Sequence, residues 1–453
     1  MFIDTHAHLF DSNYDLDLDD VLKRATDAGV DKIIVPATDI PTSEKVLELI
    51  EKYSFIYGAV GIHPHESKNW ESSLIERIEE LAKHEKVVAI GEIGLDYYYD
   101  FSPKEKQIEA FKAQLDLALK INKPVIIHNR DSDEDMMEII QYYKDTSLRA
   151  QFHCFNGKME DAKLLVRMNH FLSFTGNITF KKADDLRNIV SGISIEHILL
   201  ETDSPYLTPE PNRGRRNEPA NVKYVAETIA KLHNLNIEDI ARATSYNVFK
   251  FYGIGDKPKK SLTYQIGNNL YLNITNRCNA HCTFCDRLGE AEVSGYNLKM
   301  SKEEEPSSEA YIEQIGDPTK YNEIIFCGYG EPTIRWNVVK EIAKYVKNAG
   351  GATRLNTNGH GNLINKRDIT PELKGLVDTV SISLNSGDPR QYSEMMGLDI
   401  SHFNEMVAFA KSAKNYSNKV VMSIVSIQEV DTERARKVVE EKIGAEFRIR
   451  HFF

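Results

Sequence analysis

Short apolar runs alternate with amphipathic segments along residues 1–250. The apolar runs are rich in Val and Ile, as β-strands are, and the segments between them repeat apolar residues every three or four positions, as helices do. Eight strands are predicted in this way, at 1–9, 31–38, 56–63, 87–96, 124–130, 149–155, 171–177 and 197–205. Eight strands with crossover helices predict a closed α/β barrel of the TIM-like (β/α)8 type, with its active site at the carboxyl ends of the strands.

The alternation stops at residues 255–261, GDKPKKS, which are rich in Gly, Pro and Lys and are interpreted as an inter-domain linker. Six further strands are predicted after it, at 269–275, 322–328, 351–358, 378–385, 419–425 and 445–453. Helical segments separate them, so the right-handed crossover rule predicts a parallel sheet with helices outside, an open partial (β/α)6 barrel. The predicted domains are therefore 1–254 and 262–453.

Composition places the chain among globular proteins. Of its 453 residues 41% are hydrophobic and 27% charged, and no apolar run approaches the ~20 residues of a membrane span. The first ten residues have no basic leader, so we expect a cytoplasmic protein without a membrane partner. The net charge of -12 argues against a surface that coats nucleic acid but leaves room for a local anion site. Five cysteines, three of them clustered, indicate a metal site in a reducing compartment.

Polar residues stand where the barrel strands are predicted to end. His6 and His8 are two positions apart on the first strand and therefore on one face of it. The fourth, fifth, sixth and eighth strands add Glu92, His128, His153 and Asp203. A single histidine at a strand end is more often structural, but four imidazoles and two carboxylates together exceed what one ion needs. We predict a binuclear metal site in which a carboxylate such as Glu92 bridges two ions, an arrangement suited to phosphoester chemistry.

The segments around these residues resemble the TatD family of metal-dependent deoxyribonucleases, within the amidohydrolase-like barrels. The resemblance is carried by FIDTHAHL, GIHPH, AIGEIGLDYY, PVIIHNRD, FHCFNG and LLETDSPYLTPEPNRGRRNEP. It implies that one ion is held by His6, His8, Glu92 and Asp203, and the other by Glu92, His128 and His153. It also implies two divalent ions, Mg, Mn or Zn, and 3'-5' exonuclease action on DNA, with Asp203 and Glu92 as catalytic residues.

Three further residues are candidates for contacts with substrate phosphate. Arg130 follows His128 by two positions on the same strand face, where its planar guanidinium could pair with a phosphate oxygen or form a salt bridge at the rim. Arg213 opens a basic loop, RGRR, that either supplies positive potential or is simply solvated. His63 ends the third predicted strand beside His65 and could be a substrate group.

The stretch NRCNAHCTFCDR places Cys278, Cys282 and Cys285 in the loop after the first strand of the second half. Thiolates at this spacing can hold zinc or an iron–sulfur cluster. His281 could complete a zinc knuckle, although closed zinc sites usually bring their ligands in two pairs and no second pair follows. Cys327, which ends the second strand, is expected to be a buried core thiol rather than a radical donor.

This half resembles the radical S-adenosylmethionine (SAM) superfamily over residues 262–453. Four features carry the resemblance: CNAHCTFC with Phe284 before its last cysteine, GYGEPT, LNTNG and SISLN. It implies that the three cysteines hold one [4Fe-4S] cluster and that SAM chelates its fourth iron. An external one-electron reductant of the flavodoxin or ferredoxin type would then drive cleavage of SAM to a 5'-deoxyadenosyl radical. The residues implied in SAM binding are Gly330, Glu331, Pro332, Ser383 and Asn385, the last two of which equally fit ordinary strand-end roles.

Two complete sets of site residues in one chain predict a bifunctional enzyme. We expect a hydrolase of phosphoester bonds in DNA or nucleotides, fused to a radical SAM enzyme whose substrate cannot be read from the sequence. Two alternatives stay open. The barrel could hydrolyse an ester or amide, such as the aminoacyl ester of a charged RNA, or it could serve as a docking module for the radical half.

Overall fold

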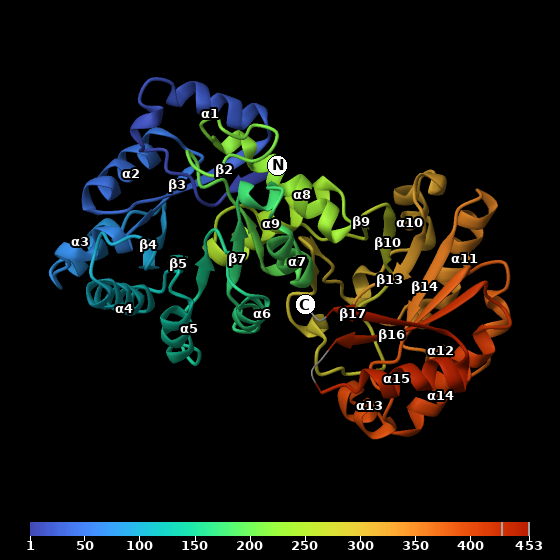
Figure 1. The fold of residues 1–453 in the computed structure, drawn as a ribbon. Helices are drawn as coiled ribbons and strands as arrows, with labels where there is room; N and C mark the ends of the chain where they lie inside the picture. Colours follow the sequence, from blue (N-terminus) through green and yellow to red (C-terminus); the bar gives the residue numbers. More distant parts are fainter. Residues whose placement is uncertain (427–428, 452–453) are drawn as a thin grey trace. The chain divides into compact units, whose positions relative to one another are not determined.

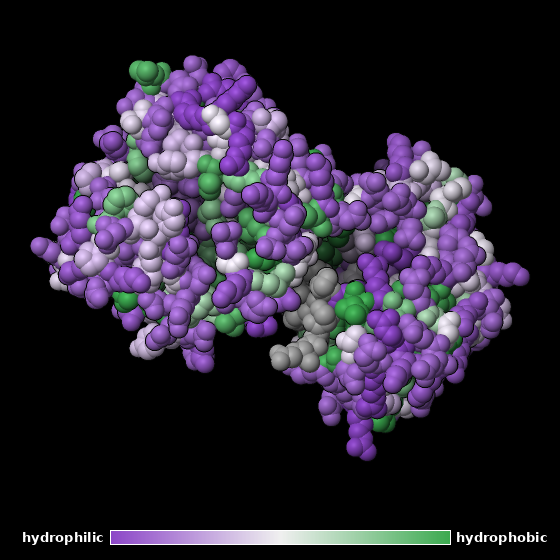
Figure 2. Space-filling view, in the orientation of Figure 1, coloured by the Kyte–Doolittle hydropathy of each residue, from purple (hydrophilic) through white to green (hydrophobic). Residues whose placement is uncertain are grey.

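The computed structural model describes residues 1–426 and 429–451. Two compact units follow one another along the chain, Met1–Lys257 and Pro258–Phe453 (Figure 1). Their boundary falls inside the segment 255–261, whose linker role stays a prediction. Hydrophilic side chains cover most of the face seen in Figure 2, and no helix among the described residues is long and apolar enough to cross a membrane.

An eight-stranded sheet forms the centre of the first unit, with its strands in chain order and every neighbouring pair parallel. The strands are β1 (Phe2–Asp4), β2 (Val30–Pro36), β3 (Ile56–Val60), β4 (Val87–Asp96), β5 (Val125–Arg130), β6 (Ala150–Phe152), β7 (Phe171–Phe174) and β8 (Ile198–Leu200). The Thr5 amide donates to the Leu200 carbonyl over 2.9 Å, and Ala7 bridges Ser204, so the first and last strands meet. The predicted (β/α)8 barrel is confirmed.

Nine α-helices of this unit lie in the described part of the chain: α1 (Leu18–Asp27), α2 (Ile40–Lys52), α3 (Leu74–Leu81), α4 (Lys104–Lys120), α5 (Asp133–Tyr142), α6 (Met159–Arg167), α7 (Asp184–Gly192), α8 (Val222–His233) and α9 (Ile237–Tyr252). Their apolar faces pack on the sheet. Helix α2 lies so close to β3 that a Cβ at Gly58 would come within 2.5 Å of Val46 Cγ1. Phe251 of α9 shares a buried cluster with Ile3 and Ile126, and its carbonyl accepts from Arg149, the residue before β6, so the end of α9 lies at the amino ends of the strands.

The second unit is built on a seven-stranded sheet in the order β17-β16-β15-β14-β13-β10-β9. Its strands are β9 (Thr263–Ile266), β10 (Asn269–Asn273), β13 (Ile324–Cys327), β14 (Thr353–Thr357), β15 (Thr379–Ser383), β16 (Lys419–Ser426) and β17 (Glu446–His451). The six predicted strands are present and parallel, and the sheet is open as expected. Of the last predicted strand, residues 452–453 lie outside the described residues.

One strand of this sheet was not predicted. Strand β9 runs antiparallel to β10, joined to it by a two-residue turn in which Gly267 has a φ of 56°. A short hairpin of β11 (Glu292–Val293) and β12 (Tyr296–Asn297) follows the cysteine loop.

The helices of the second unit pack on one face of its sheet. They are α10 (Ser308–Ile315), α11 (Trp336–Asn348), α12 (Gly361–Asn365), α13 (Pro389–Met396), α14 (Ser401–Ala413) and α15 (Thr432–Lys437). Leu355 and Ile382 of the sheet share a buried core with Val339 of α11 and Met406 of α14. The cysteine loop follows β10 and the GYGEPT segment follows β13, so both stand at the carboxyl ends of parallel strands.

Candidate metal centre and cysteine loop

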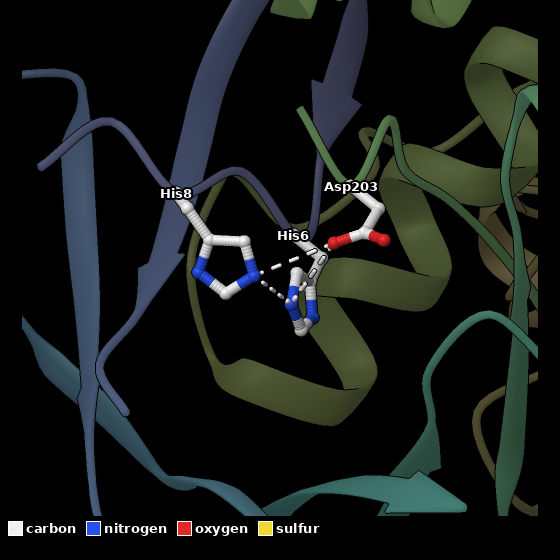
Figure 3. A group of neighbouring side chains, drawn as sticks. All are labelled: His6, His8 and Asp203. Atoms are coloured by element: carbon white, nitrogen blue, oxygen red, sulfur yellow. Dashed lines mark hydrogen bonds and ion pairs between the residues drawn. The ribbon is translucent and has the colours of Figure 1, made fainter. Parts of the chain in front are cut away.

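The carboxyl ends of the barrel strands bring the six predicted ligands together. Figure 3 shows the first group, in which the Nε2 atoms of His6 and His8 are 3.2 Å apart and Asp203 Oδ1 is 3.4 Å from His8 Nε2. Both histidines were expected on the first strand, but β1 ends at Asp4 and they lie just after it. The bridge from Ala7 to Ser204 fixes this segment beside the loop that carries Asp203.

Glu92 lies between two groups of ligands. Its Oε2 is 3.3 Å from His6 Nε2 and 3.7 Å from His8 Nε2, on the side of the first group. Its Oε1 is 2.8 Å from His128 Nδ1 and 3.0 Å from His153 Nε2, which form the second group. One carboxylate therefore faces both groups with different oxygens.

His63 also reaches the second group. Its Nε2 is 3.5 Å from Glu92 Oε1 and its side chain is buried, so it stands among the ligand atoms rather than at the rim. Its sequence position suggested a contact with substrate phosphate, which stays untested. Its closeness to Glu92 and His128 makes it equally able to contribute to a metal site.

The spacing of these atoms fits divalent ions. Two atoms bound to one ion at about 2.0–2.2 Å lie roughly 2.8–3.6 Å apart for bond angles between octahedral and tetrahedral. Most of the separations above fall in this range, and the donors are the imidazole and carboxylate groups that zinc and manganese accept. Three sets could each hold an ion: His6 with His8 and Asp203, His6 with His153 and Glu201, and His63 with Glu92 and His128.

Burial and mutual charge shift Glu92, Asp203, His6 and His63 toward their metal-binding forms. Despite burial, the neighbouring carboxylates raise the pKa of His8, His128 and His153, so a bound ion would displace a proton from these rings. Burial alone would raise the pKa of Glu92, yet the surrounding histidines, led by His153, hold that pKa well below its ordinary value. The pKa of Asp203 is lowered too: burial alone would raise it, but the hydrogen bond from His8 and the charges of His153, His6 and His8 together outweigh burial. Burial lowers the pKa of His6, and that of His63 to about 4. The carboxylates are thus ionised and these two imidazoles neutral, as ligands must be.

Asp96, at the end of β4, was not among the predicted site residues. Its Oδ2 is 3.0 Å from His128 Nε2 and 2.8 Å from His65 Nε2, and its Oδ1 accepts from the backbone amides of Tyr98 and Tyr99. A buried carboxylate behind a ligand histidine fixes its ring and raises its basicity. The signal was available, since residue 96 follows Glu92 by four positions and so shares its strand face.

Glu201 was missed as well. It is fully buried, and its Oε1 accepts from the Cys154 amide and lies 3.6 Å from His153 Nδ1. Its Oε2 accepts from Ser173 Oγ and Gln151 Nε2. Its place two residues before Asp203 in the ETDSP segment could have identified it.

The two predicted phosphate-binding arginines lie at the exposed rim. The guanidinium carbon of Arg130 is 3.9 Å from the centre of the Tyr98 ring, and that of Arg213 is 3.4 Å from the Phe180 ring. Three positions after Arg213 in the basic loop, Arg216 pairs with Asp17 over 2.7 Å. The phosphate contacts of Arg130 and Arg213 stay predictions.

Three cysteines of the second unit, Cys278, Cys282 and Cys285, are free thiols in the loop after β10. Cys278 Sγ accepts from the Ala280 amide over 3.4 Å, and Cys282 Sγ is 3.4 Å from Met396 Sδ. Burial raises the pKa of Cys278 and takes that of Cys282 to about 12, whereas Cys285 is exposed. A soft metal centre that takes thiolates would therefore displace their protons on binding.

Three of the residues predicted to contact SAM, Gly330, Glu331 and Asn385, are linked by contacts to this loop or to the residues just before it. The amides of Gly330 and Glu331 donate to the Thr275 and Arg277 carbonyls, and a Cβ at Gly330 would lie 2.2 Å from the Arg277 oxygen. Only glycine fits so close an approach. Pro332 is buried at the start of the short 3-10 helix Pro332–Arg335.

The Glu331 side chain is enclosed rather than open. Burial raises its pKa, and its oxygens accept from Thr333, Thr357 Oγ1 and the Asn358 amide. Asn358 Nδ2 in turn lies 3.8 Å from Cys278 Sγ. This chain of contacts ties the GYGEPT segment to the cysteine loop.

Asn385 and Ser383 stand at the end of β15. Asn385 Nδ2 donates to Met396 Sδ over 3.0 Å, the sulfur that Cys282 also contacts, and its buried Oδ1 accepts no hydrogen bond from the described residues. Ser383 Oγ accepts from Arg450 over 3.3 Å. Cys327 is buried, as expected, with its Sγ 3.1 Å from Tyr264 Oη.

Known families match both units. Residues 3–253 match the model of the family TatD related DNase, and residues 272–441 that of the radical SAM superfamily. The chain is 46% identical over 254 residues to the uncharacterized metal-dependent hydrolase YabD of Bacillus subtilis, a match that spans 56% of this chain and 100% of that protein. It is 37% identical to the 3'-5' ssDNA/RNA exonuclease TatD of Shigella flexneri, over 55% of this chain and 98% of that one.

Solved structures agree for the barrel. The crystal structure of YJJV, a TatD homologue from Escherichia coli K12, superposes with a TM-score of 0.54 at 30% identity, covering 56% of this chain and 98% of that chain. A TatD family hydrolase from Entamoeba histolytica gives 0.51 at 27% identity, over 55% and 97%. The chain therefore belongs to the TatD related DNase family of metal-dependent hydrolases, and it carries a radical SAM domain, from a second family of enzymes, after the barrel.

Proposed function

We propose that the barrel is a 3'-5' exonuclease that hydrolyses terminal phosphodiester bonds of DNA, with two divalent ions. The observation that carries the proposal is Glu92, whose two oxygens face separate ligand groups at 2.8–3.7 Å. A relative that is 37% identical to the barrel is named a 3'-5' ssDNA/RNA exonuclease, which supports nucleic acid as the substrate class. Bound ions would supply the Lewis acidity that phosphodiester hydrolysis requires.

The residues of the chain would have two separate roles, holding the ions and accepting a proton. His6, His8 and Asp203 would hold one ion, and His128 and His153 the other, with Glu92 between them. The Asp203 side chain is 14% exposed against 3% for Glu92, so its ionised carboxylate is the one that solvent reaches. Asp203 can therefore accept the proton of an attacking water, while Glu92 stays fixed between the two groups.

Digestion of single-stranded DNA labelled at its 5' end tests this proposal. We expect shortening from the 3' end that requires a divalent metal and is lost in His128→Ala and Asp203→Ala. Tyr142→Ala, at an exposed ring 82% accessible on α5, is the matched control and should keep full activity. Absence of hydrolysis with Mg, Mn and Zn, despite bound metal, would contradict the proposal, and faster release from an aminoacyl ester of RNA would favour that bond instead.

For the second unit we propose that Cys278, Cys282 and Cys285 hold one [4Fe-4S] cluster that cleaves SAM. Support comes from the matched superfamily and from the contacts that tie Cys278 to Asn358 and Cys282 to Met396. When reduced by a flavodoxin- or ferredoxin-type partner, the cluster would supply the electron for SAM cleavage. The buried Oδ1 of Asn385, which has no hydrogen-bond partner in the described part of the chain, would be available to a ligand at this edge.

Anaerobic reconstitution tests the second unit. We expect iron and sulfide to bind, and reduced protein to release 5'-deoxyadenosine from SAM, whereas Cys282→Ala should do neither. Cys327→Ala is the control, because that thiol lies in the core and should leave the iron content unchanged. Stoichiometric zinc without iron would overturn the proposal.

A further inference from the structure

Three aromatic side chains are exposed together on the loop that follows β4. Tyr98 is 57% exposed, Tyr99 40% and Phe101 55%. Isolated exposed rings are common, but a contiguous group on a rigid loop usually marks a binding surface. We call these residues and Arg130 the rim cluster.

The rings of the rim cluster are ordered against one another. Tyr99 and Phe101 stack with centroids 5.2 Å apart and an interplanar angle of 17°, and Tyr98 meets Tyr99 edge-on at 4.7 Å. The guanidinium carbon of Arg130 lies 3.9 Å from the Tyr98 centroid and 4.9 Å from that of Tyr99. The cluster therefore offers aromatic surface and a fixed positive charge side by side.

This cluster stands one imidazole away from the candidate metal centre. The His65 ring contacts Tyr99 at 5.4 Å and Phe101 at 4.8 Å on one side, and His63 at 4.4 Å on the other. Asp96 binds the Tyr98 and Tyr99 amides with one oxygen and His128 with the other. The loop thus has a fixed position relative to the ligand groups.

We propose that the rim cluster binds unpaired nucleobases of the strand whose terminal phosphodiester enters the metal centre. The inference rests on the proposed exonuclease function and deepens it by naming what selects the substrate. Aromatic rings stack on any base with little regard to sequence, and a cation beside them attracts the neighbouring phosphate. Bases inside a duplex are already stacked on one another, so the cluster favours single strands.

Charge and geometry together favour a nucleic acid strand as the ligand of the rim cluster. The molecule carries a net charge of -12, so a nucleic acid strand is repelled unless local positive groups receive it. Arg130 supplies such a charge next to the rings, and its guanidinium forms no ion pair among the residues that the structure describes. An apolar partner would form no favourable interaction with this guanidinium. A nucleic acid strand can stack its bases on the rings and pair a phosphate with the guanidinium.

The test measures binding rather than hydrolysis, so that it stays separate from the nuclease proposal. A labelled short oligothymidylate and an abasic strand of the same length are titrated by fluorescence anisotropy in the presence of a chelator. The wild-type protein should bind the strand with bases more tightly. Tyr98→Ala and Phe101→Ala should each weaken that binding by about 5- to 150-fold, the effect of losing one stacked base, and leave the abasic strand unchanged.

Two controls make the outcome decisive. Tyr142→Ala removes an exposed ring of another part of the barrel and should bind both strands as the wild type does. A blunt duplex should bind the variants and the wild type alike. Equal binding of the two strands by the wild type, or an equal loss in Tyr142→Ala, overturns the proposal. If the barrel hydrolyses no strand but the base-dependent binding persists, the exonuclease function fails and the rim cluster stands.

Discussion

In both units the candidate site lies at the carboxyl ends of parallel strands, but the contacts that hold the site residues in place differ. In the barrel, ligand histidines have a buried carboxylate behind them, Asp96 for His128 and Glu201 near His153. In the second unit, the sulfur atoms of Cys278 and Cys282 make contacts of 3.4–3.8 Å, and Cys285 is exposed. The difference indicates a metal centre organised before its ions bind and a cysteine loop that its ligand organises.

Hydrogen exchange with and without bound metal would expose this difference most strongly. On reconstitution with iron and sulfide, amides of residues 276–287 should exchange at least about a hundredfold more slowly, since a ligand at a hundred times its Kd contributes about 2.7 kcal/mol. Amides around His6 and His8 should change much less when divalent ions are added to the barrel. Equal slowing in both places would show that the barrel site is no more preorganised than the cysteine loop.

Removing the carboxylate behind one ligand histidine should make the metal centre of the barrel less preorganised, as we infer for the cysteine loop of the second unit. Asp96→Asn deprives His128 and His65 of a carboxylate, and we expect kcat/KM on single-stranded DNA to fall by about 10- to 100-fold. SAM cleavage by the same protein should not change. Asp116→Asn, which alters a carboxylate bonded to Tyr143 away from the site, is the matched control. A decrease of similar size in the control would mean that the effect is general destabilisation.

A fall in pH should lower the free energy of unfolding of both units by similar amounts. This effect should be smaller than those of the two preceding experiments. Burial lowers the pKa of His170 in the barrel and of His360 in the second unit to about 4, from an ordinary 6.5. The unfolded chain therefore takes up these protons first, so the stability contributed by the neutral rings is complete above pH 6.5 and is lost as the pH falls toward 4. At about pH 5 each histidine should cost roughly 2 kcal/mol relative to neutral pH.

The two tryptophans allow this loss to be measured unit by unit. Trp70 is buried in the barrel and Trp336 in the second unit, so Trp336→Phe and Trp70→Phe proteins report urea unfolding of one unit each. His360→Gln should reduce the acid sensitivity reported by Trp336 and leave that reported by Trp70 unchanged. A change in the signal from Trp70 would contradict the assignment.

The sequence predicted the strands of both units because buried strands produce apolar runs that residue periodicity detects. It missed β9, whose four residues pair with β10 only through the turn at Gly267 and show little apolar character. Local pattern does not reveal which neighbour a short polar strand will find.

For the candidate site, the sequence predicted the six candidate metal ligands but not the contacts that surround them. His6, His8, Glu92, His128, His153 and Asp203 converge as expected because the carboxyl ends of barrel strands must meet. What each side chain touches beyond that depends on loops. Arg130 was assigned to phosphate from its strand face alone, whereas its stacking on Tyr98 depends on the path of the loop after β4. His63 and Glu201 likewise join the centre through contacts across the barrel.

The divided role of Asp96 limits how this barrel could be redesigned. One of its oxygens sets the loop that presents Tyr98 and Tyr99, and the other sets the rings of His128 and His65. Lengthening or shortening that loop would turn the carboxylate and misplace His128 with it. New substrate preferences are therefore best sought by exchanging the side chains at positions 98, 99 and 101 on a loop of unchanged length.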